Sequence, residues 1–420
     1  MPLELSARDR AMLDGDAGEG PRIAMRIVAS MAEVLDADHL IDVASAHVDG
    51  CLYQGQASLD FAERLARAGA RVSIPTTLNV GGVDLLHPGL YRGDPDRAAR
   101  SRRLMGLYEG MGCRPTWTCA PYQLPDRPSF GQHVAWAESN AIVFANSVLG
   151  ARTDRYGDFI DICAAITGRA PAAGLHLDAN RAGGILFRLS SVPGRLLSED
   201  ILYPLLGHLI GAESGSLIPV IDGLPPTTTE DQLKALGAAA ASSGSVGLFH
   251  AVGVTPEAGS LEQAFAGRVP RREVTVTPAL MAEIRDGLST TTGRIDAVSV
   301  GTPHFSLDEF GALTPLIERT AINPEVDFYV STSRAILAEV ERMGWMSAYR
   351  RAGIQIVTDT CTYIAPILSP STRVVMTNSG KWAYYAPGNI GVEVVLGSLA
   401  ECVRSAAEGR VWRDDALWRG

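Results

Sequence analysis

The chain has 420 residues with a formal net charge of −10, and 46% of the residues are hydrophobic and 20% charged. This length allows a large core divided into two or three lobes, and the negative charge argues against a nucleic-acid or anionic-membrane partner. The N-terminus lacks the apolar stretch of a secretory signal and no apolar run could span a bilayer, so we expect a cytoplasmic protein without a membrane partner.

The N-terminal part is predicted to alternate helices with short strands. Helices are expected over 7–13, 21–35, 61–68 and 96–111, and strands over 40–44 and 71–74. The first strand runs into Ser45, His47 and Cys51, a polar ending that is typical of the mouth of an α/β site. For His47, a structural role fits the pattern as well as a catalytic one. Thr76 opens a further polar loop.

The stretch from Gly112 to Thr153 concentrates chemically useful residues. Cys113 and Cys119 lie among four prolines, and a helix is predicted to begin near His133. This apolar helix retains polar groups, so it either has an ordinary wet face or lines a polar site. Under the second interpretation, its candidate site residues are Glu138, Ser139, Asn146, Ser147 and Arg152.

Farther along the chain, the pattern becomes regular. After a helix over 156–166, a mixed region and a helix over 227–240, short strands are predicted over 246–249, 273–276, 297–300, 328–330 and 354–357. They alternate with helices over 280–286, 307–319 and 333–343, which predicts a βαβ lobe with a parallel sheet. The loops after these strands carry His304 and Cys361, and a last motif carries Asn378, Ser379 and Lys381. This motif lacks the leading glycine and the spacing of a phosphate-binding loop.

We therefore predict an α/β fold with four approximate regions. They are an N-terminal α/β lobe over 1–155 with the Cys/Glu/Arg motif, a mixed α+β lobe over 156–240, a βαβ lobe over 241–370, and a C-terminal motif segment over 371–420 that packs on the site.

The six cysteines are too few for a disulfide scaffold and show no zinc-type spacing. Cys163 and Cys402 fall in helical runs, whereas the four in turn-like segments, Cys51, Cys113, Cys119 and Cys361, are candidate ligands. Thiols spread over several loops suit an iron–sulfur cluster better than zinc. An iron with an open position is a Lewis acid that helps a hydroxyl to leave, as a hydro-lyase acting on a β-hydroxy acid requires.

Such a reaction also needs positive charge for the substrate carboxylate and groups that transfer protons. Arg152 and Lys381 can supply the charge, while His47, Glu138 and His304 can handle protons.

Five separated motifs, in the expected order, resemble the large subunit of aconitase X. They are TWTCAPYQ, WAESNAIVFANSVLGARTDR, GTPHFSLDEF, TDTC and TNSGKWAYYAPGNIGVEVVLGSLAECV, and the resemblance covers nearly the whole chain. It implies an aconitase-like fold of several α/β lobes around a central cluster pocket. A swivelling fourth lobe with a catalytic serine would lie on a separate small subunit.

The resemblance also implies ligands for the cluster. Cys119 and Cys361 match ligand cysteines of the family, but Thr302 stands where archaeal relatives have the cysteine of GCPH. We assign the third ligand to Cys51, with Cys113 as the alternative, and both 2Fe–2S and 4Fe–4S clusters remain open.

The expected catalytic set is His47, Glu138, Asn146, Arg152, His304 and Lys381, and the expected substrate-binding set is Ser45, Thr76, Ser139, Ser147, Asn378 and Ser379. Bacterial members resemble cis-3-hydroxy-L-proline dehydratases, which is the activity we favour. Dehydration of mevalonate 5-phosphate is the alternative, and a non-catalytic, metal-stabilised binding subunit is the alternative of another class.

Overall fold

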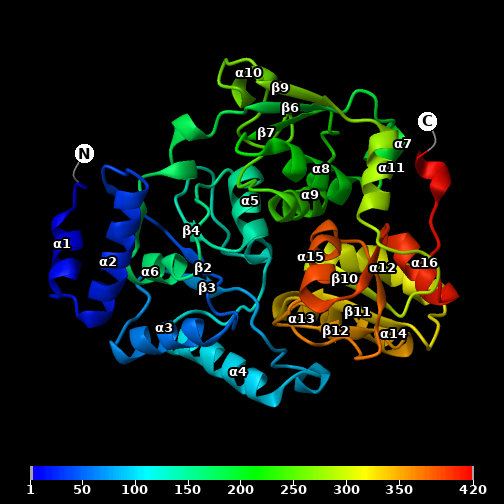
Figure 1. Ribbon diagram of the computed structural model, residues 1–420, viewed down its shortest axis with the longest axis horizontal. Helices are drawn as coiled ribbons and strands as arrows, with labels where there is room; N and C mark the ends of the chain where they lie inside the picture. The colour runs from blue at the N-terminus through cyan, green and yellow to red at the C-terminus, as the bar shows by residue number, and fades with distance from the viewer. Residues whose placement is uncertain (1–2, 419–420) are drawn as a thin grey trace. The chain divides into compact units, whose positions relative to one another are not determined.

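The computed structural model describes residues 3–418 and divides into two compact units (Figure 1). Unit 1 comprises Met1–Val83 and Asp94–Ala182, and unit 2 comprises Asp84–Gly93 and Gly183–Gly420. The segment Asp84–Gly93 thus interrupts unit 1 in sequence but packs with unit 2. No helix within residues 3–418 has the length and apolar character needed to cross a membrane.

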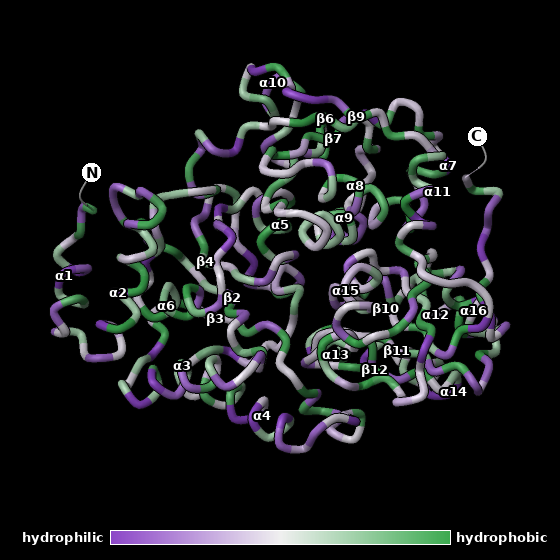
Figure 2. The backbone as a smooth tube through the Cα atoms, in the orientation of Figure 1, coloured by the Kyte–Doolittle hydropathy of each residue, from purple (hydrophilic) through white to green (hydrophobic). Residues whose placement is uncertain are grey.

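Unit 1 combines helices with two small sheets. Its helices are α1 (Ala7–Asp14), α2 (Glu19–Val34), α3 (Gln56–Arg67), α4 (Pro95–Gly110), α5 (Ser139–Ser147) and α6 (Ile160–Thr167). Ser6 and Asp9 form a capping box that starts α1. α2 is amphipathic, with apolar and polar residues interspersed along it (Figure 2), and its buried apolar face includes Met25 and Val28. Two strands, β1 (Leu40–Asp42) and β5 (Arg169–Pro171), pair antiparallel.

The second sheet of unit 1 is parallel, and β2 (Ala46–Val48) lies between β3 (Thr76–Leu78) and β4 (Ala135–Trp136). The strand predicted over 71–74 is wrong, because the strand of this region is β3, which begins at Thr76. The helix predicted from near His133 is also wrong in its start. The backbone N–H groups of Ala135 and Ala137 donate to carbonyls flanking and within β2, so this segment forms a strand before α5 begins.

The first sheet of unit 2 has the order β8-β7-β6-β9, and all its pairings are parallel. Its strands are β6 (Ile185–Arg188), β7 (Pro219–Asp222), β8 (His250–Ala251) and β9 (Arg272–Thr275). The helices of this region are α7 (Gly194–Leu197), α8 (Leu202–Ser214), α9 (Glu230–Ser243), α10 (Leu261–Ala264) and α11 (Pro278–Gly287). α8 crosses α9 closely at Gly207, where a Cβ atom would lie 2.1 Å from the Leu236 carbonyl oxygen, so only glycine fits.

The second sheet of unit 2 is also parallel, with the order β12-β11-β10-β13-β14. Its strands are β10 (Ala297–Phe305), β11 (Asp327–Thr332), β12 (Gln355–Val357), β13 (Val374–Thr377) and β14 (Glu393–Leu396). The helices are α12 (Leu307–Arg319), α13 (Arg334–Arg342), α14 (Met346–Arg351), α15 (Gly380–Ile390) and α16 (Leu399–Glu408). Phe305, Phe310 and Tyr349 are fully buried in the core beneath this sheet.

The predicted α/β class and most of the predicted alternation of strands and helices are confirmed. The strand predicted over 246–249 is wrong, because the strand of this region is β8, His250–Ala251. Strand pairing nevertheless divides the chain differently from the predicted regions. β5 and α6 pack in unit 1 beyond the predicted limit at 155. β9 pairs with β6, so the strands predicted over 241–370 belong to two sheets, and β13 and β14 from 371–420 complete the second. These pairings join residues far apart in sequence, which local patterns do not encode.

Candidate functional site

In unit 1, polar side chains follow all three strands of the parallel sheet. Asp49 comes directly after β2, Asn79 after β3, and Glu138 two residues after β4. Because the carboxyl ends of parallel strands meet at one edge, these side chains gather there, the usual position of an α/β site. Asn79 donates a side-chain hydrogen bond to the Asp49 carboxylate. The edge therefore offers two carboxylates and an amide.

Glu138 is the N-cap of α5, rather than a residue on a helix face as predicted. Its backbone φ is +73°, and its carboxylate accepts from the N–H of Ala141 at 2.9 Å. Asn140 donates to the same carboxylate and also to the Cys119 carbonyl oxygen at 2.9 Å. The Tyr122 hydroxyl donates to Asn140 at 2.6 Å, which fixes the amide. Asn140 thereby ties the backbone of Cys119 to Glu138.

The carboxyl group of Asp49 is suited to proton transfer near neutral pH. Its burial raises the pKa to about 7, and the negative charges of Glu138 and Asp158 act in the same direction. A group with this pKa can give or take a proton at cellular pH. Asp49, Asn79 and Asn140 were missed in the sequence. The available signal was that Asp49 follows a predicted strand directly, inside the polar run after it.

The other catalytic candidates of unit 1 have structural partners. His47 is buried in β2, its Nδ1 lies 2.8 Å from Thr77 Oγ1, and burial lowers its pKa to about 3, so it is neutral. Asn146 forms a pair of hydrogen bonds with the backbone of Thr153, at 2.9 and 3.1 Å. Arg152 forms an ion pair with Asp178 at 2.5 Å. Their catalytic roles stay predictions.

Cys51 and Cys113 lie in the interior of unit 1. The Cys51 sulfur is 3.4 Å from the Asn79 carbonyl oxygen and 3.6 Å from that of Val48. Burial raises the pKa of Cys51 well above its usual range and that of Cys113 to about 12, with nearby Asp161 adding to both effects. Burial and the nearby negative charge of Asp161 favour the protonated thiol of both residues over the thiolate that a metal needs.

The predicted substrate-binding residues of unit 1 fall at two places. Ser45 precedes β2 and Thr76 begins β3, so both lie at the amino edge of the sheet, where they line a cavity of about 200 Å³ together with Arg114 and Trp136. Ser139 lies in the first turn of α5, with its hydroxyl 3.4 Å from a Glu138 carboxylate oxygen, and Ser147 is buried at the end of that helix. Of these four residues, Ser139 is the one that lies beside Glu138, at the carboxyl edge of the sheet.

In unit 2, the carboxyl edge of the five-stranded sheet carries an imidazole and a thiol. His304 lies near the end of β10 and Cys361 lies four residues after β12, and their ligand atoms are within 4.8 Å of each other. Both are buried. Burial lowers the pKa of His304 to about 4, so the imidazole is neutral, and its Nε2 lies 3.3 Å from the Thr360 carbonyl oxygen. A thiol and a neutral imidazole are soft donors suited to a transition metal.

The motif after β13 surrounds a small cavity in unit 2. Ser379 caps α15 by accepting from the Trp382 N–H at 3.0 Å, and its hydroxyl donates to the Thr302 carbonyl oxygen. Asn378 and Ser379 line the cavity of about 20 Å³, room for one water molecule. Lys381 is buried in the first turn of α15. The sequence did not single out Lys234, which lines the same cavity and pairs with Asp231 at 2.8 Å and with Glu309.

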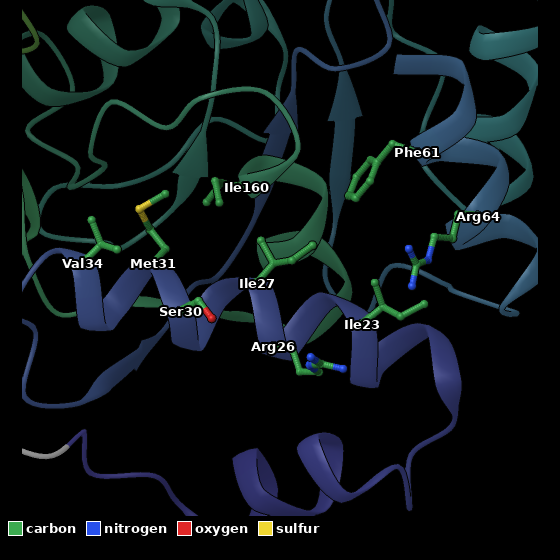
Figure 3. A pocket seen from close by; sticks show the side chains of 9 residues that line it. All are labelled: Ile23, Arg26, Ile27, Ser30, Met31, Val34, Phe61, Arg64 and Ile160. Atoms are coloured by element: carbon green, nitrogen blue, oxygen red, sulfur yellow. The ribbon is translucent and has the colours of Figure 1, made fainter. Parts of the chain in front are cut away.

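A groove of about 500 Å³ on unit 1 lies apart from this chemistry. α2 supplies most of its lining, with Phe61 and Arg64 from α3 and Ile160 from α6 (Figure 3). The lining contains apolar and basic residues and one serine, but neither a carboxylate nor a thiol. It therefore offers neither a carboxylate for proton transfer nor a thiol or imidazole for a metal.

Parallel α/β sheets with buried carboxylates at one edge and a thiol–imidazole pair at another are typical of an α/β enzyme that uses a metal or an iron–sulfur cofactor. Family models match almost the whole chain, as aconitase X first domain over residues 2–179, second domain over 183–286 and third domain over 295–408. The chain belongs to the aconitase X family.

Several relatives are similar over nearly the whole chain. "Cis-3-hydroxy-L-proline dehydratase" of Pseudomonas aeruginosa is 45% identical over 97% of this chain and 70% of its own length, and that of Hypocrea jecorina is 41% identical over 97% and 69%. "Phosphomevalonate dehydratase large subunit" of Methanothermobacter thermautotrophicus is 36% identical over 95% and 98%. All these names are of dehydratases, which supports an enzyme here.

A solved structure confirms the fold. The crystal structure of Thermococcus kodakaraensis aconitase X in its holo-form matches with a TM-score of 0.87 and 32% identity, covering 96% of this chain and 100% of that chain. The resemblance inferred from the five motifs is thus confirmed, and with it the aconitase-like fold.

Proposed function

We propose that this chain is the large subunit of an iron–sulfur-dependent hydro-lyase that dehydrates cis-3-hydroxy-L-proline. The reaction breaks the C2–H and C3–O bonds, releases water and forms a Δ2 enamine that tautomerises to Δ1-pyrroline-2-carboxylate. One observation carries the choice of substrate. Identity is 45% and 41% to two proteins with this printed activity, but 31–36% to five named phosphomevalonate dehydratase large subunits.

The residues present fit an iron–sulfur cofactor. We propose Cys119 and Cys361 as ligands, supported by their motifs and by the buried pair of Cys361 with His304. Cys51 remains our third ligand and Cys113 its alternative. Because burial raises the pKa of both thiols, His304 is a further donor to be tested. The cluster type, 2Fe–2S or 4Fe–4S, is open. When bound, a cluster with an open iron supplies a Lewis acid for the departing hydroxyl.

The chain's own residues have three tasks in this reaction. Lys381 and Arg152 supply positive charge for the substrate carboxylate, and Asn378, Ser379 and Ser139 offer hydrogen bonds to hold it. Glu138 and Asp49 are the groups that can move protons, and Asp49 is the better matched to neutral pH because its pKa is about 7. His47 and His304 are neutral and cannot serve as acids at that pH.

We further propose a small-subunit partner that carries the swivelling lobe and a catalytic serine. Support comes from the archaeal relatives, whose printed names call them large subunits. We also propose a cytoplasmic location, because six cysteines in 420 residues are too few for a disulfide scaffold, as expected in a reducing compartment.

The decisive experiment uses the chain purified without air, alone and with its small subunit, and measures turnover of cis-3-hydroxy-L-proline and of mevalonate 5-phosphate. We expect iron and acid-labile sulfide in the protein, no turnover by the chain alone, and turnover of the proline substrate by the complex. Turnover of only the phosphorylated substrate would establish the alternative activity. Full turnover by the chain alone would contradict the two-subunit proposal, and inactivity of the loaded complex on both compounds would reject the hydro-lyase.

A further inference from the structure

A ten-residue segment, Asp84–Gly93, is packed into unit 2 although both its sequence neighbours belong to unit 1. We refer to it as the strap. It contains one short 3₁₀ turn, Pro88–Leu90, and its other residues form neither helix nor strand. Its position must therefore be determined by contacts with other parts of unit 2. Those contacts converge on the loop between β12 and Cys361.

Asp84 makes the first set of contacts. Its side chain is fully buried, and it accepts hydrogen bonds from the backbone N–H of Thr358 at 2.8 Å and from the Thr358 hydroxyl at 2.9 Å. The same carboxylate accepts from the backbone N–H groups of Leu86 and His87, at 2.9 and 2.7 Å, and lies 3.0 Å from the His87 ring. The Asp84 carboxylate thus fixes the backbone of the strap at Leu86 and His87 and also binds the strap to Thr358 in the loop after β12.

Asp359 makes a reciprocal contact in the opposite direction. Its buried carboxylate accepts from the Leu85 N–H at 3.0 Å, so each segment contributes a carboxylate that receives a backbone N–H of the other. Arg334, the first residue of α13, donates two hydrogen bonds to the same carboxylate, at 2.6 and 2.8 Å. Beyond this point the Arg92 N–H donates to the Pro366 carbonyl oxygen at 2.8 Å.

The backbone of Asp359 needs this support. Its φ is +60°, a left-handed conformation that a residue with a side chain adopts at a cost. The strain lies two residues before Cys361, and the intervening Thr360 carbonyl oxygen is 3.3 Å from the His304 ring. The path of the loop that delivers the Cys361 thiol beside His304 is therefore fixed by two carboxylates and one arginine. Asp359 lies two residues before the thiol, whereas Asp84 and Arg334 lie outside the motif that contains Cys361.

We propose that Asp84, Asp359 and Arg334 are positioning residues that hold the Thr358–Cys361 loop in a ligand-ready conformation before any metal binds. The inference rests on the proposed role of Cys361 as a cluster ligand. Residues that orient a ligand typically change metal affinity or activity by roughly 10–100-fold when they are removed. Because these hydrogen bonds join protein groups alone, they must also restrict Cys361 in the metal-free chain.

The experiment compares the wild-type chain with Asp84→Ala, and it measures two properties. The first is iron and sulfide per chain, with the visible absorption spectrum, after anaerobic reconstitution over a range of iron concentrations. The second is the rate at which iodoacetamide alkylates Cys361 in the metal-free chain, mapped by mass spectrometry. We expect Asp84→Ala to bind iron about 10-fold or more weakly and to alkylate at Cys361 about 10-fold or more faster.

Glu401→Ala is the matched control. Glu401 is another buried carboxylate of unit 2 that accepts from two backbone N–H groups, those of Ser398 at 2.7 Å and Asp414 at 2.8 Å. We expect it to lower the melting temperature without changing iron affinity or Cys361 alkylation. Equal changes in Glu401→Ala, or wild-type values in Asp84→Ala, would overturn the proposal.

Two further variants keep the test decisive. If Asp84→Ala does not fold, Arg334→Gln replaces a side chain that is 33% exposed and should give the same two changes in smaller size. Asp84→Asn keeps an acceptor for Thr358, so it should bind iron more tightly than Asp84→Ala and less tightly than the wild type. If Cys361→Ala binds iron like the wild type, the assignment of Cys361 as a ligand fails. The alkylation rate of Cys361 in metal-free Asp84→Ala still decides whether Asp84 holds the Thr358–Cys361 loop in place.

Discussion

Two parallel sheets of this protein, the three-stranded sheet of unit 1 and the five-stranded sheet of unit 2, follow the same topological rule but carry different chemistry at their carboxyl edges. The carboxyl edge in unit 1 presents Asp49 and Glu138, whose carboxyl groups accept hydrogen bonds and can exchange protons, and Asn79, whose amide donates to Asp49. The corresponding edge in unit 2 presents His304 and Cys361, which suit a metal, with Lys381 nearby in sequence after β13. The topology places polar side chains at a carboxyl edge in both units, but the side chains decide that one edge is suited to proton transfer and the other to a metal.

The comparison predicts that the largest effect comes from the thiol in unit 2. Cys361→Ala should remove the cluster and reduce activity by more than the roughly 100-fold typical of residues that only support a ligand. Cys402→Ala, at a buried cysteine in α16 of the same unit, should keep full iron content and cost on the order of 1 kcal/mol in stability. Iron and sulfide analysis distinguishes them. A cluster that persists in Cys361→Ala would remove the metal site from this edge.

The next largest effect is expected at the proton-handling edge of unit 1. Glu138→Gln preserves an acceptor for the cap of α5 but removes the charge, so turnover should fall by about 10²–10⁴-fold with iron content unchanged. Asp9→Asn alters a buried capping carboxylate elsewhere in unit 1 and should lower the melting temperature with normal turnover. Loss of iron in Glu138→Gln would show that the two edges do not divide their tasks as we propose.

A smaller effect concerns the pH dependence of stability. Folding raises the pKa of Asp49 from about 3.9 to about 7, so the folded chain binds this proton more tightly than the unfolded chain. The free energy of unfolding should consequently fall as pH rises from about 4 to about 7. Asp49→Asn should flatten this fall in part, leaving the contributions of other buried carboxyl groups with raised pKa values, which are about 6 for Asp161 and Asp200 and about 7 for Glu309. Melting temperatures at pH 5 and 7.5 measure it.

Asp126→Asn is the control for this pH dependence, since Asp126 lies in an exposed ion pair with Arg114. It should leave the slope with pH as in the wild type. A slope in Asp49→Asn equal to that of the wild type would show that Asp49 is charged in the folded chain across this range.

The smallest effect is expected at the amino edge of the unit 1 sheet. If Ser45 and Thr76 contact the substrate, Ser45→Ala and Thr76→Val should each raise KM about 5-fold, the value of one net hydrogen bond, with kcat unchanged. Both line the cavity beside Arg114, away from the carboxyl edge. Unchanged KM in both variants would restrict substrate binding to the carboxyl edges.

Much of the fold was readable because its signals are local. α12 was predicted over 307–319 and is found there, since Ser306 and Glu309 form a capping box within one turn. The parallel alternation in the second half was also readable from residue periodicity, and it correctly placed Cys361 in a loop after a strand. His304, predicted in a loop after the strand over 297–300, lies instead within β10, which extends to Phe305. The five motifs then gave the family, because each is a contiguous run.

The sequence by itself thus determined the α/β class, most helices, the family and the residue types of the candidate site. Tertiary structure alone decided that 135–136 is a strand, that Asp49 has a pKa near 7, that Asn146 and Arg152 have structural partners, and that Asp84 holds the loop before Cys361. Each of these depends on hydrogen bonds or burial contributed by segments remote in the chain. Thr358 and Asp84 are 274 residues apart, and no local propensity encodes a contact over that separation.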